Sequence, residues 1–128
     1  MGVTEHKFNV ENTIFRIFDV GEHWSQWQFW APYFDDVDAI IFMAAISAFD
    51  QKLEEDEDVN CMDYFIESFN KICNHKLFTN TGIILFLNEI DILKQKLTTT
   101  KVKDYFPGYE GKQYFGKLID TKKNIVNN

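Results

Sequence analysis

The alternation of apolar and polar positions predicts a β-hairpin at the start of the chain. Residues 5–10 alternate loosely, and residues 13–18 alternate more strictly, with β-branched and aromatic side chains on both faces. The two residues between them, 11–12, have the chemistry of a turn. The second strand would deliver Asp19 and Gly21 to its carboxyl end, which is where open α/β sheets place a ligand crevice.

Two longer apolar runs predict buried strands. Residues 39–46 form one uninterrupted run, and runs that are apolar on both faces are typical of sheets covered on both sides. Residues 82–87 form the other, and it ends in a polar cluster that contains Asp91. Two strands that each end near an aspartate, Asp19 and Asp91, suggest a nucleotide-type site.

Helical spacing predicts three helices. Residues 23–33 carry three tryptophans at a spacing of three, which makes an aromatic stripe on a helix. Residues 59–74 are amphipathic, and residues 91–97 are long enough for one or two turns. The stripe consists of Trp24, Trp27 and Trp30.

An acidic run and a weakly patterned end complete the chain. Five acidic residues, 54–58, follow a predicted loop at residues 47–50 and lie where the helix over residues 59–74 should begin. Carboxylates at a helix N-terminus are stabilised by about 0.3–1 kcal/mol each, so we interpret the run as a solvated helix start rather than a metal site. Beyond residue 98 the pattern weakens, apart from a turn at residues 106–109.

Composition narrows the class of protein. The chain has 128 residues, 45% of them hydrophobic, which is enough for one domain with a core. Its formal net charge of −7 argues against a nucleic-acid partner, because phosphate contacts need clustered Lys and Arg. No apolar run reaches the roughly 18 residues of a membrane span. Cys61 and Cys73 are expected to be reduced and unbridged, because they lie at opposite ends of one predicted helix.

Five segments, taken together and in order, resemble the α subunit of heterotrimeric G proteins. They are FRIFDVG at 15–21, DAIIF at 38–42, LEEDEDVN at 53–60, ICNHKLFTNT at 72–81 and IILFLNEID at 83–91. The resemblance covers about residues 2–111 and leaves a divergent tail at residues 112–128. It implies a single partial GTPase domain over residues 1–128. The fold class is then α/β, a partial Ras-like P-loop NTPase fold with a mostly parallel sheet, an antiparallel hairpin strand and helices on both faces.

The resemblance assigns nucleotide-binding roles to five consecutive residues at the end of the hairpin, Asp19, Val20, Gly21, Glu22 and His23. Asp19 falls on the aspartate that holds Mg²⁺ through water, and Gly21 on the first of two paired glycines. Glu22 replaces the second glycine, whose N–H meets the γ-phosphate, and its carboxylate would repel a triphosphate. His23 occupies the position of the catalytic glutamine, which orients the attacking water.

The base-recognition motif Asn-Lys-x-Asp appears as Asn88, Glu89, Ile90 and Asp91. By resemblance, Asp91 accepts the two N–H donors of guanine, and Asn88 ties the surrounding loops together. Glu89 replaces the lysine that lies over the purine, so affinity should fall. The alternative, from the residues alone, is that Asn88 and Asp91 cap the turn that follows.

One motif of the family is missing from the sequence. No Gly-x-x-x-x-Gly-Lys-[Ser/Thr] segment occurs, so we expect the fold to lack the first strand and the P-loop that cradles phosphates. Without them the central sheet should be less stable. The family is a GTPase that binds GTP or GDP with Mg²⁺, whereas this truncated and divergent chain is expected to be impaired in both binding and hydrolysis.

The resemblance also implies partners. These are the βγ dimer, a receptor and an effector in signal transduction, which would place a cytoplasmic chain at the inner face of the plasma membrane. Trp30 matches a tryptophan that contacts βγ, whereas Trp24 and Trp27 stand where the family has arginine. Two alternatives remain open: a non-enzymatic module that binds βγ or an effector through this region, or an incomplete gene product.

Overall fold

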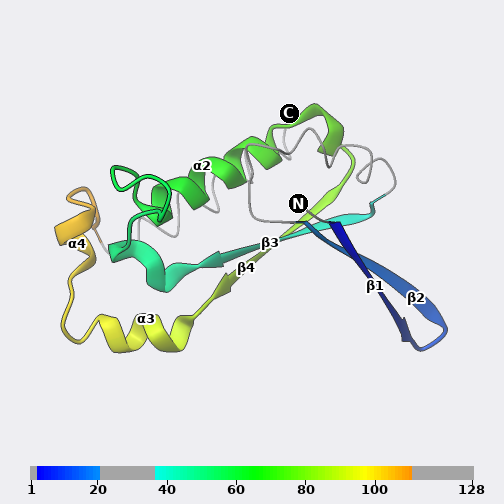
Figure 1. The fold of residues 1–128 in the computed structure, drawn as a ribbon, viewed down its shortest axis with the longest axis horizontal. Helices are drawn as coiled ribbons and strands as arrows, with labels where there is room; N and C mark the ends of the chain where they lie inside the picture. Colours follow the sequence, from blue (N-terminus) through cyan, green and yellow to red (C-terminus); the bar gives the residue numbers. More distant parts are fainter. Residues whose placement is uncertain (1–2, 21–36, 111–128) are drawn as a thin grey trace. The chain divides into compact units, whose positions relative to one another are not determined.

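The computed structural model describes residues 3–20 and 37–110, which belong to two compact units divided after Asp38 (Figure 1). Each unit is described by itself. The predicted helix over residues 23–33, with its tryptophans, and the tail from residue 112 lie outside the described residues. The α/β class is confirmed, because strands and helices mix along the chain.

The first unit is the predicted β-hairpin. Strand β1, Val3–Val10, pairs antiparallel with strand β2, Thr13–Val20, along their whole length. The turn residues Glu11 and Asn12 have positive φ angles of 47° and 72°. Two-residue hairpin turns of type I′ need positive φ at both positions, so this turn matches the right-handed twist of the strands.

The two faces of the hairpin differ in chemistry. One face carries the exposed apolar side chains Phe8, Val10, Phe15 and Ile17. The opposite face carries exposed Ile14 and an ion pair in which Arg16 Nε lies 2.7 Å from Glu5 Oε1. The hydrogen bond from Arg16, followed by the charges of Arg16 and Lys7, holds the pKa of Glu5 below its ordinary value. Among the described residues, this ion pair therefore joins β1 to β2 in addition to the backbone ladder.

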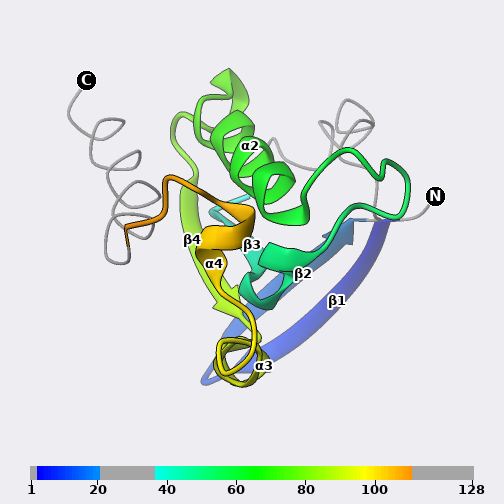
Figure 2. The ribbon, with the colours of Figure 1, turned by 90° about the vertical axis from the view of Figure 1, so that its left-hand side faces the viewer.

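The second unit is built on two parallel strands. Strand β3, Ala39–Ala45, pairs with strand β4, Gly82–Asn88, from the first residue of each to the last. Helix α2, Cys61–Cys73, runs alongside them in both views (Figures 1 and 2). The ring of Phe69 on α2 contacts Phe42 on β3 edge to face, with centroids 5.3 Å apart. The two predicted strands and the amphipathic helix are thus confirmed.

The expectation that residues 39–46 are covered on both faces is wrong for the described residues. Every second side chain of both strands is exposed, apart from that of Ala45 at the end of β3; Met43 is 61% exposed and Phe86 50%. Helix α2 covers the alternate positions, because side chains two residues apart share one face of a strand. The uninterrupted apolar run at residues 39–46 predicted the strand correctly but did not predict which of its side chains are buried.

A buried 3₁₀ segment, η2, replaces the loop expected at residues 47–50. It spans Ile46–Asp50, and its first four residues are all buried. Ile46 and Phe49 form the core cluster with Met62 of α2 and with Phe106. The core of the unit therefore lies around η2, directly after the carboxyl end of β3.

The acidic run at residues 54–58 does not begin a helix, which corrects the sequence-based interpretation. These residues form turns and bends, and α2 starts three residues later. Its start is fixed by Asn60, whose side-chain oxygen accepts the Met62 backbone N–H at 2.7 Å. Asp63 is the acidic residue in the first turn of the helix.

The rest of the described chain contains short elements. A 3₁₀ turn, η3, spans Lys76–Phe78, and helix α3, Ile90–Lys96, confirms the predicted one or two turns. Helix α4, Val102–Tyr105, was not predicted. The turn at residues 106–109 is confirmed by a 2.9 Å hydrogen bond from the Tyr109 N–H to the Phe106 carbonyl. Among the helices that the structure describes, none could cross a bilayer.

Candidate functional site

The loop that follows β4 lies at the same sheet edge as η2. The register pairs Ala45, the last residue of β3, with Asn88, the last residue of β4. Because the two strands are parallel, the segments after them leave the sheet at one end. The predicted motif residues from Asn88 to Asp91 therefore stand next to the buried η2 segment, and Ile90 and Asp91 already belong to the first turn of α3.

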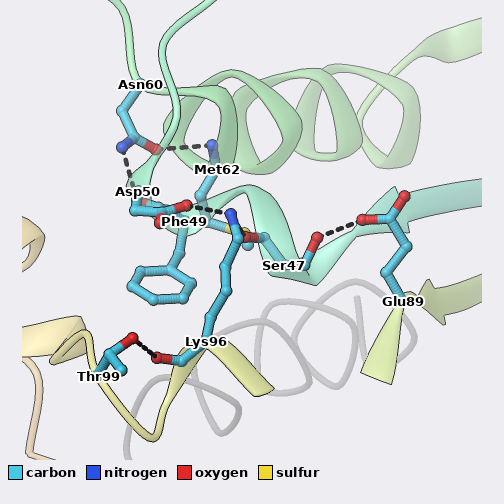
Figure 3. Close-up of polar contacts among 8 residues, drawn as sticks. All are labelled: Ser47, Phe49, Asp50, Asn60, Met62, Glu89, Lys96 and Thr99. Carbon is cyan, nitrogen blue, oxygen red and sulfur yellow. Dashed lines mark hydrogen bonds and ion pairs between the residues drawn. The ribbon is translucent and has the colours of Figure 1, made fainter. Parts of the chain in front are cut away.

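Glu89 has the most unusual backbone of this loop. It adopts the left-handed conformation with φ 64° and ψ 36°, which is uncommon for a residue other than glycine. Its carboxylate oxygen Oε2 accepts a hydrogen bond from the hydroxyl of Ser47 on η2, as Figure 3 shows. Ser47 is 3% exposed. Sequence reasoning missed this residue, since nothing in the pattern connects residues 42 positions apart.

Lys96 makes a second link between α3 and η2. Its Nζ donates to the Ser47 carbonyl at 2.9 Å and lies 2.6 Å from Asp50 Oδ1 (Figure 3). The side chains of Lys96 and Asp50 are 24% and 18% exposed, so water screens this pair only partly. Because Glu89 precedes α3 and Lys96 lies in its last turn, both ends of this helix are bonded to one buried segment.

Asn60 connects η2 to α2 in the same way. Its side-chain amide donates to the Phe49 carbonyl at 2.8 Å while its oxygen caps the helix (Figure 3). Segment η2 is thus hydrogen-bonded to the starts of both neighbouring helices. The capping role of an asparagine before an apolar periodic run has a sequence signal, whereas its contact with Phe49 has none.

Asn88 and Asp91 are both exposed. Within residues 3–20 and 37–110, their side chains form no hydrogen bond or ion pair. The residue at the helix cap is Glu89, and it makes no side-chain capping bond. The alternative that Asn88 and Asp91 cap the turn is therefore wrong for this structure. Their polar atoms are available to a ligand.

The other predicted site residues lie in the first unit or outside the described chain. Asp19 is exposed near the end of β2, opposite Thr4, and Val20 pairs with Val3. Gly21, Glu22 and His23, like Trp24, Trp27 and Trp30, fall outside the described residues. In the ranges that are described, no group of three or more His, Cys, Asp or Glu side chains could hold a metal.

The two cysteines are unbridged, as predicted. Cys61 and Cys73 are both free and half-buried, at the first and last positions of α2. Twelve residues of helix separate them by about 18 Å, far more than a disulfide spans. Burial raises the pKa of the Cys61 thiol, which lowers its reactivity.

Comparisons with known proteins give the same family as the motifs. A family model of the G-protein alpha subunit matches residues 1–126. The guanine nucleotide-binding protein alpha-3 subunit of Caenorhabditis elegans is 46% identical over 129 aligned residues, 98% of this chain and 36% of that protein. The G-protein complex alpha subunit gpaA of Aspergillus fumigatus is 46% identical over 93% of this chain and 34% of its own length.

An α/β unit with a polar loop after a parallel strand defines a broad class of ligand-binding proteins. Within that class, the chain belongs to the G-protein α-subunit family. The resemblance carried by the sequence motifs is confirmed. The chain spans about a third of the length of the curated relatives it matches.

Proposed function

We propose that this chain contributes guanine recognition to a G-protein α subunit in receptor-coupled signalling. The proposal rests on the side chains of Asn88 at the end of β4 and Asp91 in the first turn of α3, which form no hydrogen bond or ion pair among the described residues. The segment that joins them is hydrogen-bonded to the buried η2. Membership of the family supplies the ligand class. The Caenorhabditis elegans relative is named as a guanine nucleotide-binding protein subunit.

The chemistry of the loop fits a guanine base. The Asp91 carboxylate can accept hydrogen bonds from the N1–H and the 2-amino group of guanine, and such bonds to a charged group contribute about 1.5–3 kcal/mol each. Asn88 offers an amide with both donors and an acceptor. Glu89 adds a second negative charge beside the site, which weakens binding of a phosphorylated ligand.

The roles predicted for phosphate and Mg²⁺ binding rest on the resemblance. Asp19 would hold Mg²⁺ through water, since Mg²⁺ binds through one or two carboxylates plus substrate phosphates, and the exposed Asp19 carboxylate fits this role. Val20, Gly21 and Glu22 would line the phosphates, and His23 would orient the attacking water. Bound Mg²⁺ would neutralise charge that develops on the phosphates.

We propose that these 128 residues hydrolyse GTP poorly. The sequence contains no Gly-x-x-x-x-Gly-Lys-[Ser/Thr] cradle, and phosphoryl transfer depends almost entirely on positioning and electrostatics. Glu22 brings a carboxylate where a glycine would meet the γ-phosphate. Base recognition by the loop after β4 does not depend on these parts.

A second candidate function is protein binding through the tryptophan stripe. The three tryptophans at a spacing of three would give a helix an apolar face, which is typical of a partner site. The partner would be the βγ dimer, with receptor and effector contacts elsewhere. Retention of βγ by the immobilised chain, lost on Trp30→Ala and kept on Phe8→Ala, would support this function. Equal retention by both variants would exclude it.

Guanine binding is tested by titrating the purified chain with a fluorescent GTP analogue and Mg²⁺. We expect saturation near 1 mM, equivalent to about −4 kcal/mol, and competition by GMP but not by AMP. Equal competition by AMP, or no saturation, would contradict the proposed function. Saturation at micromolar concentration would instead contradict the cost that we assign to Glu22 and Glu89.

A further inference from the structure

The contacts of Ser47 involve both its backbone and its side chain. Its carbonyl accepts from Lys96 Nζ, and its hydroxyl donates to the Glu89 carboxylate (Figure 3). Since the positive charge of Lys96 is paired with Asp50, Glu89 has no cationic partner among the described residues. The Ser47 hydroxyl is therefore the group that satisfies the Glu89 carboxylate.

The backbone of Glu89 needs such support. A left-handed residue with a side chain is strained, and it persists where the surroundings fix it. The Glu89 carbonyl also accepts the Leu93 N–H at 2.9 Å, which closes the first turn of α3. Leu93 in turn packs on the core cluster around η2. Holding the Glu89 side chain thus fixes the backbone that joins Asn88 to Asp91.

We propose that Ser47 is a positioning residue for guanine recognition, an inference that rests on the function proposed above. Its hydroxyl holds Glu89 against η2, and this sets the spacing between the Asn88 amide and the Asp91 carboxylate. A guanine base has an N1–H and a 2-amino group for Asp91, whereas hypoxanthine lacks the 2-amino group. Correct positioning of Asp91 therefore determines how strongly guanine is preferred over hypoxanthine.

The test compares GMP with IMP as ligands of the full chain, by NMR titration. The variant Ser47→Ala removes the hydroxyl, and Ser68→Ala removes another buried hydroxyl, on α2, as the matched control. Loss of one hydrogen bond corresponds to about a 3- to 10-fold change in an equilibrium. We expect the preference for GMP over IMP to fall by this factor in Ser47→Ala and to stay unchanged in Ser68→Ala.

A second readout follows hydrogen exchange of the Leu93 amide. Exchange should accelerate by a similar 3- to 10-fold factor in Ser47→Ala, because the first turn of α3 opens more often. In a Glu89→Ala background, Ser47→Ala should change neither the GMP preference nor the exchange rate, since Ser47 acts through Glu89. If Ser47→Ala fails to fold, Glu89→Ala alone removes the same bond from its other end and gives the same comparison.

The outcomes separate this inference from the proposed function. An unchanged GMP preference in Ser47→Ala would overturn the positioning role and leave guanine binding intact. Wild-type chain that binds GMP and IMP equally, or neither, would overturn the proposed function. In that case hydrogen exchange of the Leu93 amide tests whether the Ser47 hydroxyl holds Glu89 in place. Faster exchange in Ser47→Ala would support this role, and an unchanged exchange rate would overturn it.

Discussion

The hairpin of residues 3–20 and the unit built on η2 contain similar apolar side chains but bury them differently. In the hairpin, Phe8 and Phe15 face each other across the strands and are each 50% exposed. In the second unit, Phe49 and Phe69 are 3% and 2% exposed. A two-stranded hairpin is at best marginally stable by itself, whereas packing against a helix stabilises a pair of strands.

The same difference separates the two aspartates predicted to bind nucleotide. Asp19 lies near the end of β2, where backbone pairing alone positions it among the described residues. Asp91 lies in a helix whose two ends are bonded to a buried segment. A segment fixed in this way can present a carboxylate at low entropic cost, so base recognition by Asp91 should be better preserved than the role predicted for Asp19.

Removal of a core ring should give the largest effect. Phe69→Ala should destabilise the second unit by about 3–5 kcal/mol, because it leaves a cavity beside Phe42. Phe15→Ala should cost less than about 1 kcal/mol, since it removes one exposed cross-strand pair. Urea unfolding followed by far-UV circular dichroism measures both. Similar losses would contradict the contrast between the units.

Breaking the link between α3 and Asp50 should have the next largest effect. Lys96→Met should cost about 1.5–3 kcal/mol, because it removes charge-assisted bonds to Asp50 and the Ser47 carbonyl. The control is Lys71→Met, whose exposed pair with Glu67 at 2.7 Å should contribute about 0.3–0.5 kcal/mol. Urea unfolding measures both variants. Equal losses of unfolding free energy would show that the bonds from Lys96 to η2 stabilise the unit no more than an exposed ion pair does.

The helix cap should contribute less. Asn60→Ala should destabilise the second unit by about 1 kcal/mol, since it removes the cap of α2 and the bond to the Phe49 carbonyl. Asn74→Ala at the other end loses one exposed bond to the Asn70 carbonyl and serves as the control. Amide exchange in the first turn of α2 should accelerate only in Asn60→Ala. Faster exchange in both variants would contradict the conclusion that Asn60 stabilises the start of α2.

The smallest effect should be the pH dependence of the hairpin. The pKa of Glu5 is lowered in the folded state, first by the hydrogen bond from Arg16. The stabilisation is therefore present above the unfolded pKa and is lost as the pH falls through the folded pKa, below the ordinary value of 4.5. NMR titration of the Glu5 carboxyl should show this shift, and Arg16→Ala should abolish most of it. An unshifted wild-type titration would contradict the ion pair.

Much of the fold followed from local pattern. The hairpin, β3, β4, α2 and α3 were each visible as a period or an apolar run. The burial of individual side chains could not be predicted from this pattern, because the same apolar run contains Ala44, which is 5% exposed, and Met43, which is 61% exposed. The start of α2 was predicted too early because the acidic run was interpreted as the helix N-terminus, whereas the Asn60 cap, two residues after that run, determines the start.

The candidate site was only partly visible in the sequence. Asn88 and Asp91 could be found because their spacing is a local motif. Ser47, Asp50 and Lys96 could not, since their contacts with the loop or with one another span more than 40 residues. The left-handed backbone of Glu89 also had no signal, because glycine or asparagine usually marks that conformation.

The most direct test of guanine recognition by the loop after β4 is a reversal of base preference. Xanthine carries a carbonyl where guanine carries the 2-amino group, so Asp91→Asn exchanges an acceptor for a donor at the matching position. Titration of wild-type chain and Asp91→Asn with GMP and XMP should show that wild type prefers GMP and that the variant prefers XMP. The same order of preference in both proteins would contradict guanine recognition by Asp91.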